Sequence, residues 1–205
     1  MKKAIISAMM LVSVVFAGSH AENHKLATHV PGIRTVEYVK KAKSAKADSV
    51  NKVNAQKVVK DSLVKEVDKY IRKRLKNFDK DISEHIANEC LANDIDICFA
   101  LAQAQIETNF GTTGIGKSRK SMYGVYRSYK SKKHSTSDWI KLLKEKYLGS
   151  KKTVKKLMDN YITLNGQRYS QNPKYESILK STYKTIKSTT NIYRLQNTCS
   201  HFYDS

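Results

Sequence analysis

Apolar residues recur every three or four positions along much of the chain, which is the spacing of one face of an α-helix. In the clearest case, residues 61–76, the apolar positions share one face and the opposite face is basic. Similar apolar faces follow over 82–91, 139–147, 154–162 and 175–186. Alternating patterns are rare, and only 122–126 is expected to form a short extended segment. The pattern therefore predicts an all-α domain with one short extended or hairpin region.

One stretch departs from the amphipathic pattern because it is apolar on nearly every side. Residues 97–106 carry the sequence ICFALAQAQI, which is typical of a helix buried from several directions. Asp96 precedes the stretch as a candidate N-cap, and Gly111 is expected to end the helix. Small residues and Gln103 lie about one turn before Glu107, on the face that another molecule would approach.

Glu107 is the one acidic residue in this apolar stretch. Burial near the C-terminus of a helix disfavours a carboxylate, because desolvation and the helix dipole both favour the protonated form. We therefore expect the pKa of Glu107 to be raised. A carboxylic acid that stays protonated near neutral pH is suited to act as a general acid. The alternative is a structural acid satisfied by a backbone donor.

Capping signals mark where the other helices are expected to begin. The residues concerned are Asp81 with Glu84, Ser135 with Asp138, Thr153, and Asn172 followed by Pro173. Residues 188–205 show little pattern, and we expect them to form a C-terminal tail whose apolar side chains could dock on the domain.

The N-terminus has the features of a secretory signal peptide. Lys2 and Lys3 precede an apolar run from Ala4 to Gly18, and Ser19-His20-Ala21 resembles a cleavage signal. Residues 1–21 are thus expected to be removed, and the mature protein to be exported to the periplasm or the extracellular space. Residues 22–60 are polar and basic, so we expect a loosely ordered linker or arm. A spacer is the preferred role of this arm, with a tether to an anionic surface as the alternative.

The chain is strongly basic, with a formal net charge of +20. For an exported protein, this charge favours contact with an anionic cell-envelope surface over nucleic acid; a merely solubilising surface is the alternative. The three cysteines, Cys90, Cys98 and Cys199, leave their pairing open. No cluster of Cys and His has metal-ligand spacing, so neither a metal nor another cofactor is predicted. The oligomeric state is not predicted.

Three motifs in order resemble the glucosaminidase domain of glycoside hydrolase family 73, a group related in fold to lysozyme and lytic transglycosylases. The first is ALAQAQIETNFGT, which contains Glu107. The second is Ser121-Met122-Tyr123-Gly124, with serine where the family usually has asparagine. The third runs from Tyr169 to Tyr175 and includes Asn172-Pro173. The resemblance extends over about 83–187 and also fits exported glucosaminidase-domain proteins of the Bacteroidetes.

The resemblance implies a lysozyme-like helical domain, placed at 61–187, with a groove that binds peptidoglycan glycan strands. It implies endo-β-N-acetylglucosaminidase activity, in which β-1,4 bonds between amino sugars are cleaved and Glu107 is the catalytic acid. Tyr169 is expected to lie beside the acid, where its hydroxyl would orient the N-acetyl group or stabilise positive charge. The residues expected to bind substrate are Gln103, Tyr123, Tyr126 and Tyr175. A core role is the alternative for Tyr169 and Tyr123.

The second carboxylate that most glycosidases use has no clear candidate here. No Asp or Glu lies between Glu107 and Asp138, and Asp138 is interpreted as a helix cap. Asp159 and Glu176 are interpreted as surface and helix-dipole residues. Two routes remain open: the N-acetyl group of the substrate acts as nucleophile, or the 6-hydroxyl closes on the anomeric carbon as in a lytic transglycosylase. A glycan-binding module without catalysis and a basic scaffold that coats acidic polymers are the non-enzymatic alternatives.

Overall fold

The structure is a computed structural model that describes residues 33–149, 153–163, 165–170 and 172–203. The predicted signal peptide and the first part of the predicted arm lie outside the described residues. Contacts between residues divide the chain into two units, Met1–Ser44 and Ala45–Ser205. The two cavities described below lie in the second unit.

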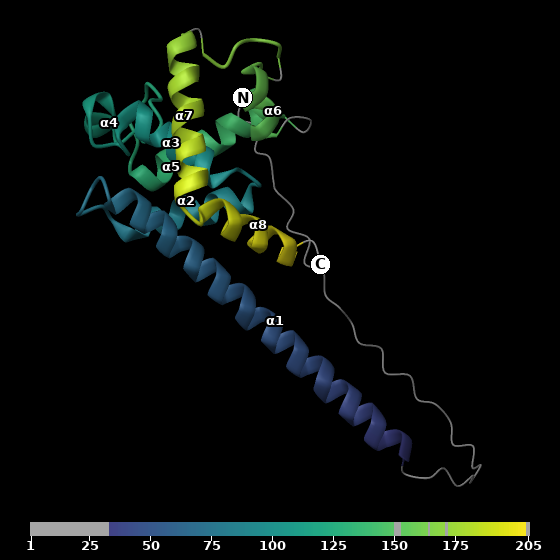
Figure 1. The fold of residues 1–205 in the computed structure, drawn as a ribbon. Helices are drawn as coiled ribbons and strands as arrows, with labels where there is room; N and C mark the ends of the chain where they lie inside the picture. The colour runs from purple at the N-terminus through teal and green to yellow at the C-terminus, as the bar shows by residue number, and fades with distance from the viewer. Residues whose placement is uncertain (1–32, 150–152, 164, 171, 204–205) are drawn as a thin grey trace, which may run out of the picture. The chain divides into compact units, whose positions relative to one another are not determined.

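The described residues are almost entirely helical (Figure 1). The helices are α1 (Ile33–Arg72), α2 (Lys80–Ala92), α3 (Ile97–Thr108), α4 (Gly114–Arg119), α5 (Lys132–Leu142), the π-helical turn η1 (Leu143–Leu148), α6 (Val154–Asn160), α7 (Pro173–Thr189) and α8 (Ile192–Tyr203). No strand occurs in this part of the chain, and 162 and 168 form one isolated antiparallel bridge. The all-α prediction is confirmed. None of the described helices combines the length and the apolar character needed to cross a membrane.

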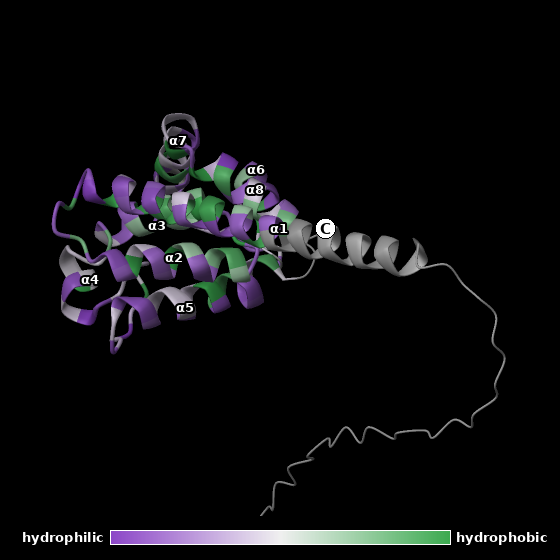
Figure 2. Cartoon of the chain, turned by 90° about the horizontal axis from the view of Figure 1, so that it is seen from below, coloured by the Kyte–Doolittle hydropathy of each residue, from purple (hydrophilic) through white to green (hydrophobic). Residues whose placement is uncertain are grey.

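Helix α3 is the centre of the domain and contacts α2, α4, α7 and α8. Figure 2 shows its hydrophobic residues between α2 and α7. Its residues from Ile97 to Ala104 are all buried. The Asp96 side chain caps its N-terminus by accepting the Cys98 N–H at 2.8 Å, as predicted. The helix ends at Thr108, before the expected Gly111, because Asn109 already adopts a left-handed conformation.

Within the described residues 33–60, helix α1 corrects the expectation of a loosely ordered arm over 22–60. The helix runs without a break from Ile33 to Arg72, and residue 61 marks no boundary in secondary structure. Residues 33–60 contain no Gly or Pro, so helix propensity allows this continuation even without an apolar stripe. Near its middle, the Gln56 amide donates to the Phe202 carbonyl at 3.2 Å, and Val59 packs against the core.

Helix α8 forms where a tail with little pattern was expected over 188–205, and apolar side chains of this segment dock on the domain, as expected. Ile192 and Cys199 are buried on the core. The buried Gln196 side chain accepts the Ile97 N–H at 2.8 Å and donates to the Ile95 carbonyl at 2.8 Å. These two bonds join α8 to the loop that precedes α3, so the tail belongs to the folded domain.

Two of the predicted caps are also wrong. Asp79, not Asp81, caps α2, and Ser131 caps α5 by accepting the His134 N–H at 3.1 Å. Because α5 begins at Lys132, Asp138 lies in the interior of that helix and is not a cap. The caps at Thr153 and Asn172 are confirmed. Cys90, Cys98 and Cys199 are buried free thiols in this structure.

Candidate active site

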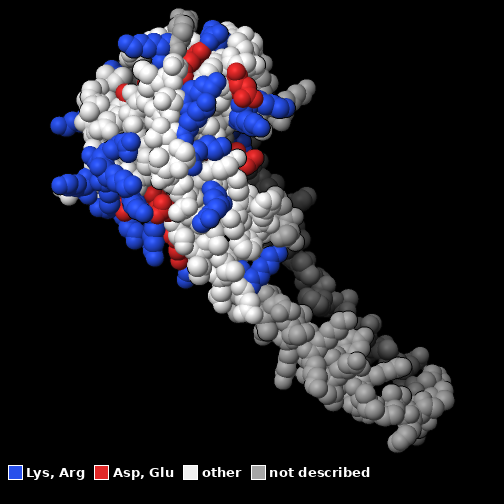
Figure 3. Space-filling model, in the orientation of Figure 1, with Lys and Arg blue, Asp and Glu red and all other residues white. Residues whose placement is uncertain are grey.

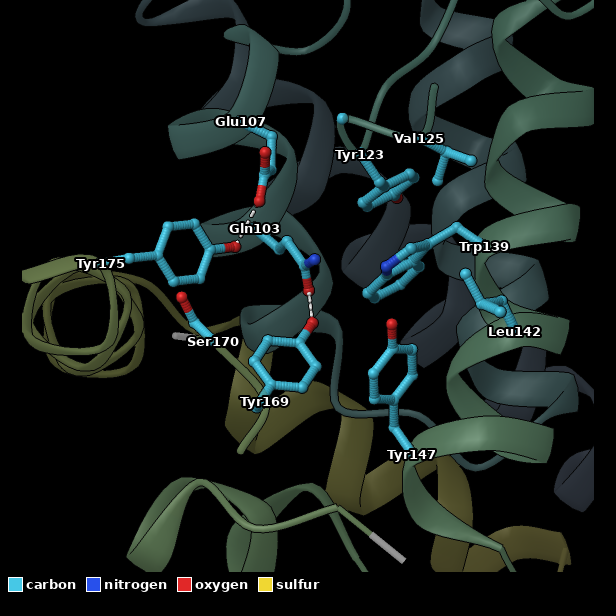
Figure 4. Close-up of a pocket in the computed structure, with 11 residues that line it drawn as sticks. Gln103, Glu107, Tyr123, Val125, Trp139, Leu142, Tyr147, Tyr169, Ser170 and Tyr175 are labelled. Carbon is cyan, nitrogen blue, oxygen red and sulfur yellow. Dashed lines mark hydrogen bonds between the residues drawn. The ribbon is translucent and has the colours of Figure 1, made fainter. Parts of the chain in front are cut away.

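A cavity of about 440 Å³ lies at the C-terminal end of α3 (Figure 4). Helices α3, α5 and α7, the turn η1 and two connecting segments all contribute to its wall. The lining residues are Gln103, Glu107, Tyr123, Gly124, Val125, Trp139, Leu142, Tyr147, Tyr169, Ser170 and Tyr175. We refer to this set as the Glu107 cavity.

Glu107 lies on the last turn of α3 and faces this cavity rather than the core. The expected burial of this carboxyl is only partial, since Glu107 is exposed to the cavity. The surrounding protein still removes part of its hydration and raises its pKa, as expected from the sequence. The Tyr175 hydroxyl donates to Glu107 Oε1 at 2.5 Å and partly offsets this rise in pKa, because the bond stabilises the ionised form.

Gly124 packs against the other side of the Glu107 carboxyl. A Cβ atom at this position would lie 2.3 Å from Glu107 Oε2, which is far inside van der Waals contact. Gly124 also has a φ of +72°, a conformation that side chains disfavour. Glycine is therefore required at 124 for two reasons, and the Glu107 carboxyl is held between a backbone segment and the Tyr175 hydroxyl.

The segment before Gly124 is fixed by bonds to both peptide groups of Met122. The Thr108 hydroxyl donates to the Met122 carbonyl at 2.7 Å, and the Met122 N–H donates to Ser135 Oγ at 2.9 Å. Gly116 of α4 packs directly on Thr108, where a Cβ atom would come within 2.4 Å of the Thr108 side chain. These contacts tie the end of α3 to the segment that carries Gly124.

Aromatic rings form much of the remaining wall. Tyr123 and Trp139 stack in parallel, with ring centroids 4.0 Å apart. Tyr147 meets Tyr169 edge to face at 5.2 Å, and the Tyr169 hydroxyl donates to Gln103 Oε1 (Figure 4). Such rings offer apolar surface with polar edges, and sugars present complementary surfaces. The cavity thus combines one acid with an aromatic wall.

The structure brings together most of the residues that the sequence singled out. Glu107, Gln103, Tyr123, Tyr169 and Tyr175 all line the cavity. Their roles differ from expectation in one respect, since the tyrosine that donates to Glu107 is Tyr175, while Tyr169 donates to Gln103.

Tyr126 does not line the Glu107 cavity. Its side chain is 82% exposed, and the Arg119 guanidinium lies 5.9 Å from the centre of its ring. Tyr126 was predicted to bind substrate and lies two residues after the second motif, where the backbone directs its ring to solvent and away from the cavity.

The sequence analysis gave no binding role to six lining residues: Gly124, Val125, Trp139, Leu142, Tyr147 and Ser170. Gly124 and Ser170 lie within the second and third motifs and Val125 follows the second, so the motifs were the signal that could have identified these three. Trp139 and Tyr147 were expected on the inward face of a helix, and the same face that packs on the core also borders the cavity.

Glu107 supplies the only carboxyl among the residues that line this cavity. Asp138 forms an ion pair with Arg127 and accepts the Tyr129 hydroxyl at 2.8 Å, so its charge is already engaged. Glu176 is buried in an ion pair with Arg168. Over the described residues, no group of three or more His, Cys, Asp or Glu is arranged to hold a metal ion.

Comparison with protein families matches residues 83–188 to the model named Glucosaminidase, described as mannosyl-glycoprotein endo-beta-N-acetylglucosaminidase. This range contains every residue of the Glu107 cavity and more than half of the chain. The chain belongs to the glucosaminidase family. Comparisons with curated proteins and with solved structures found no match. Membership of the glucosaminidase family supports a glycosidase activity on amino-sugar glycans such as peptidoglycan.

Proposed function

We propose that this glucosaminidase is an exported peptidoglycan hydrolase that cleaves β-1,4 bonds between amino sugars, with Glu107 as its general acid. The observation that carries the proposal is a single carboxyl at the wall of an aromatic cavity, with a raised pKa and fixed on two sides by Tyr175 and Gly124. A raised pKa keeps the acid protonated closer to neutral pH, where it has a proton to donate.

In the first step, the protonated Glu107 carboxyl gives its proton to the glycosidic oxygen as the bond from that oxygen to the anomeric carbon breaks. The leaving sugar departs as a neutral alcohol, and positive charge develops at the anomeric carbon. Tyr175 keeps the carboxyl oriented through its hydrogen bond. Gln103 and Tyr169, joined by their own hydrogen bond, offer polar groups on the same wall for the substrate.

The nucleophile of this reaction comes from the substrate, because the cavity lining supplies no second carboxyl. The carbonyl oxygen of the N-acetyl group bonds to the anomeric carbon and forms a cyclic oxazolinium ion, as in known substrate-assisted glycosidases. The Glu107 carboxylate then takes a proton from water while the water oxygen attacks the anomeric carbon. The ring opens, the N-acetyl group is restored, and Glu107 is again protonated.

Lytic transglycosylation is the second candidate, and the same single carboxyl favours it. After the first step, the 6-hydroxyl oxygen of the same sugar bonds to the anomeric carbon, and its proton passes to the Glu107 carboxylate. The product is a 1,6-anhydro sugar and no water is consumed. This route needs only one catalytic group, which acts first as acid and then as base.

Export to the periplasm or cell surface is part of the proposal, since that is where peptidoglycan lies. It is supported by the signal-peptide features of residues 1–21 and by a net charge that suits an anionic envelope.

The test is to incubate the mature protein with purified peptidoglycan and to weigh the released fragments by mass spectrometry. New reducing ends would identify hydrolysis, and 1,6-anhydro ends would identify transglycosylation. Glu107→Gln is expected to lower the rate by about a hundredfold or more, because the proton donor is lost. Glu84→Gln, which removes an exposed carboxyl on α2, is the matched control and should be fully active. Binding to peptidoglycan without any release would point to a binding module, and equal rates for the two variants would refute Glu107 as the acid.

A further inference from the structure

A second cavity, of about 610 Å³, lies between α6, α7 and the start of α8. Four lysines line it: Lys155 from α6, and Lys180, Lys184 and Lys187 from α7. Figure 3 shows basic side chains along α7 and beside α6 on the face that it presents. We refer to this site as the lysine cavity. It shares no lining residue with the Glu107 cavity.

The lysine charges are not neutralised within the described part of the chain. No hydrogen bond or ion pair of the Lys155, Lys180 or Lys184 side chain occurs there. Lys180 and Lys184 are four residues apart on α7, a spacing at which like charges destabilise a helix. The fold therefore carries a repulsion that a bound anion would relieve.

The two aspartates of the cavity offset only part of this charge. Both carboxylate oxygens of Asp96 accept hydrogen bonds, Oδ1 from the start of α3 and Oδ2 from the Tyr183 hydroxyl at 2.7 Å, and these neutral donors orient the carboxylate without cancelling its charge. Asp159 is the other acid against four lysines. The cavity therefore keeps a positive charge that is available to a ligand.

The rest of the lining is one apolar residue, two aromatic residues and Ser188. Met158 is buried, and Tyr183 and Tyr193 contribute their rings. The Lys187 ammonium lies 3.4 Å from the centre of the Tyr193 ring and 3.3 Å from the Tyr183 hydroxyl, so it is held between the two rings. An ammonium group fixed beside aromatic faces suits a ligand that has both a ring with apolar surface and an anionic substituent.

We propose that the lysine cavity binds an acidic glycan, one whose sugars carry carboxylate or phosphate groups. Its volume is in the usual range for small-ligand sites and would admit a short stretch of such a polymer. The choice of a glycan over other polyanions rests on the proposed function, because the same helix α7 carries Tyr175 into the Glu107 cavity. Tyr175 and Lys184 are separated by about 13 Å along α7, so the site would hold the enzyme on a polymer at a point distinct from the cut.

The test measures binding of tetragalacturonate to the mature protein by calorimetry. This probe has a carboxylate on every sugar and contains no bond between amino sugars, so its binding is read independently of cleavage and of Glu107. Maltotetraose, a neutral glucan, is the uncharged comparison. We expect tetragalacturonate to bind and maltotetraose to bind at least about tenfold more weakly, a loss of roughly 1.4 kcal/mol.

The decisive variant is the triple change Lys155→Gln, Lys180→Gln and Lys184→Gln, which should weaken tetragalacturonate binding by tenfold or more. The matched control replaces three exposed lysines elsewhere, Lys73, Lys76 and Lys117, with glutamine and removes the same charge. It should bind as the parent protein does. Equal losses in the two triple variants would overturn the proposal, because binding would then follow overall charge.

Two further probes separate the glycan from other anionic partners. Tetradeoxythymidylate has phosphates and aromatic bases but no glycan, and phosphatidylglycerol vesicles present anionic headgroups on a membrane. The proposal is supported if both probes bind more weakly than tetragalacturonate, or if they bind the triple lysine variant as tightly as the parent protein. It is overturned if either binds more tightly through the same three lysines.

Discussion

The hydrogen bond from Tyr175 to Glu107 controls two properties of the acid, its orientation and its affinity for a proton. Burial raises the pKa of Glu107, and the Tyr175 hydroxyl lowers it by stabilising the carboxylate. The two effects can be separated, since removing the hydroxyl leaves the surrounding protein in place. The carboxyl would then be both less well oriented and harder to ionise.

Tyr175→Phe is therefore expected to lower kcat on the order of tenfold, the usual cost of one hydrogen bond to a charged group. The pKa of Glu107 should rise further, because the ionised form loses its donor. In the proposed mechanism the protonated form of Glu107 is the active one, so the alkaline limb of the pH profile of kcat/KM should move to higher pH. Tyr126→Phe, at an exposed tyrosine outside the cavity, is the control. An alkaline limb that moves to lower pH would contradict the role given to Tyr175.

Gly124→Ala tests how closely the backbone approaches the acid. The new Cβ atom would collide with Glu107 Oε2 and displace the carboxyl, so we expect activity to fall by about a hundredfold. Gly166→Ala is the matched control, because Gly166 also has a positive φ of +75° but would have nothing within 4 Å of its Cβ. Both changes should cost about 1–2 kcal/mol of stability through backbone strain. If the two variants retained equal activity, the close contact between Gly124 and Glu107 would not be required for activity.

At the same scale, the sequence predicted the position of Glu107 better than that of the side chains around it. Gln103 and Glu107 are four residues apart on one helix, so helical geometry alone places them together. Tyr169 precedes the start of α7 and Tyr175 follows it. Which of the two reaches Glu107 depends on the path of the chain at this turn, and the sequence pattern does not determine that path. Tyr126 follows Gly124 in the chain, and the left-handed glycine turns the chain so that this ring faces solvent.

Among the helices, α8 is joined to the start of α3 by two buried side-chain hydrogen bonds, in addition to its apolar contacts. Gln196 satisfies an N–H in the first turn of α3 and a carbonyl in the preceding loop, both at buried positions. The first N–H groups of a helix have no partner within the helix. The Gln196 side chain accepts one of these bonds, which water would otherwise accept.

Gln196→Ala is expected to lower the free energy of unfolding by about 1–3 kcal/mol, because two buried backbone groups lose their partner. Urea denaturation followed by circular dichroism would measure the change. Asn197→Ala, at the adjacent exposed position, should leave the midpoint within error of the parent. A glutamine variant as stable as the asparagine variant would show that α8 is not anchored in this way.

The helices that the sequence predicted well are those with a clear apolar stripe. The stretches 82–91 and 175–186 lie in observed helices, 61–76 does so up to the end of α1 at Arg72, and the apolar run after Asp96 is the buried centre. Two elements were missed, for different reasons. The first half of α1 has no apolar period to detect, whereas α8 does carry apolar residues at helical spacing, Ile192, Leu195 and Cys199, and could have been predicted. The cap at Ser131 was missed because Ser135 and Asp138 offered an equally good signal nearby.

For the whole molecule, the domain boundary is the feature on which sequence and structure differ most. The sequence places the start of the domain at Asp61, and contacts place the start of the second unit at Ala45. The residues between them include Gln56 and Val59, which contact α8 and the core.

A fragment of residues 45–205 is therefore expected to melt at the same temperature as the mature chain. A fragment of residues 61–205 should be less stable by about 1–3 kcal/mol, since it loses the Val59 packing and the Gln56 hydrogen bond. Differential scanning calorimetry on the three proteins would measure this. If the two fragments melted at the same temperature, residues 45–60 would not stabilise the domain, and the boundary predicted at residue 61 would be correct.

The contact between Gly124 and Glu107 also limits the mutations through which this active site can evolve. A single base change converts a glycine codon to one for aspartate or glutamate, which would be the shortest genetic route to a second carboxyl beside the first. At position 124 that route is closed, because any side chain there displaces the existing acid. A valine codon reaches the same two acids by one base change, and Val125 lines the cavity without this constraint. A lineage that acquired a two-carboxylate mechanism would therefore be expected to do so at 125 and to keep its glycine at 124.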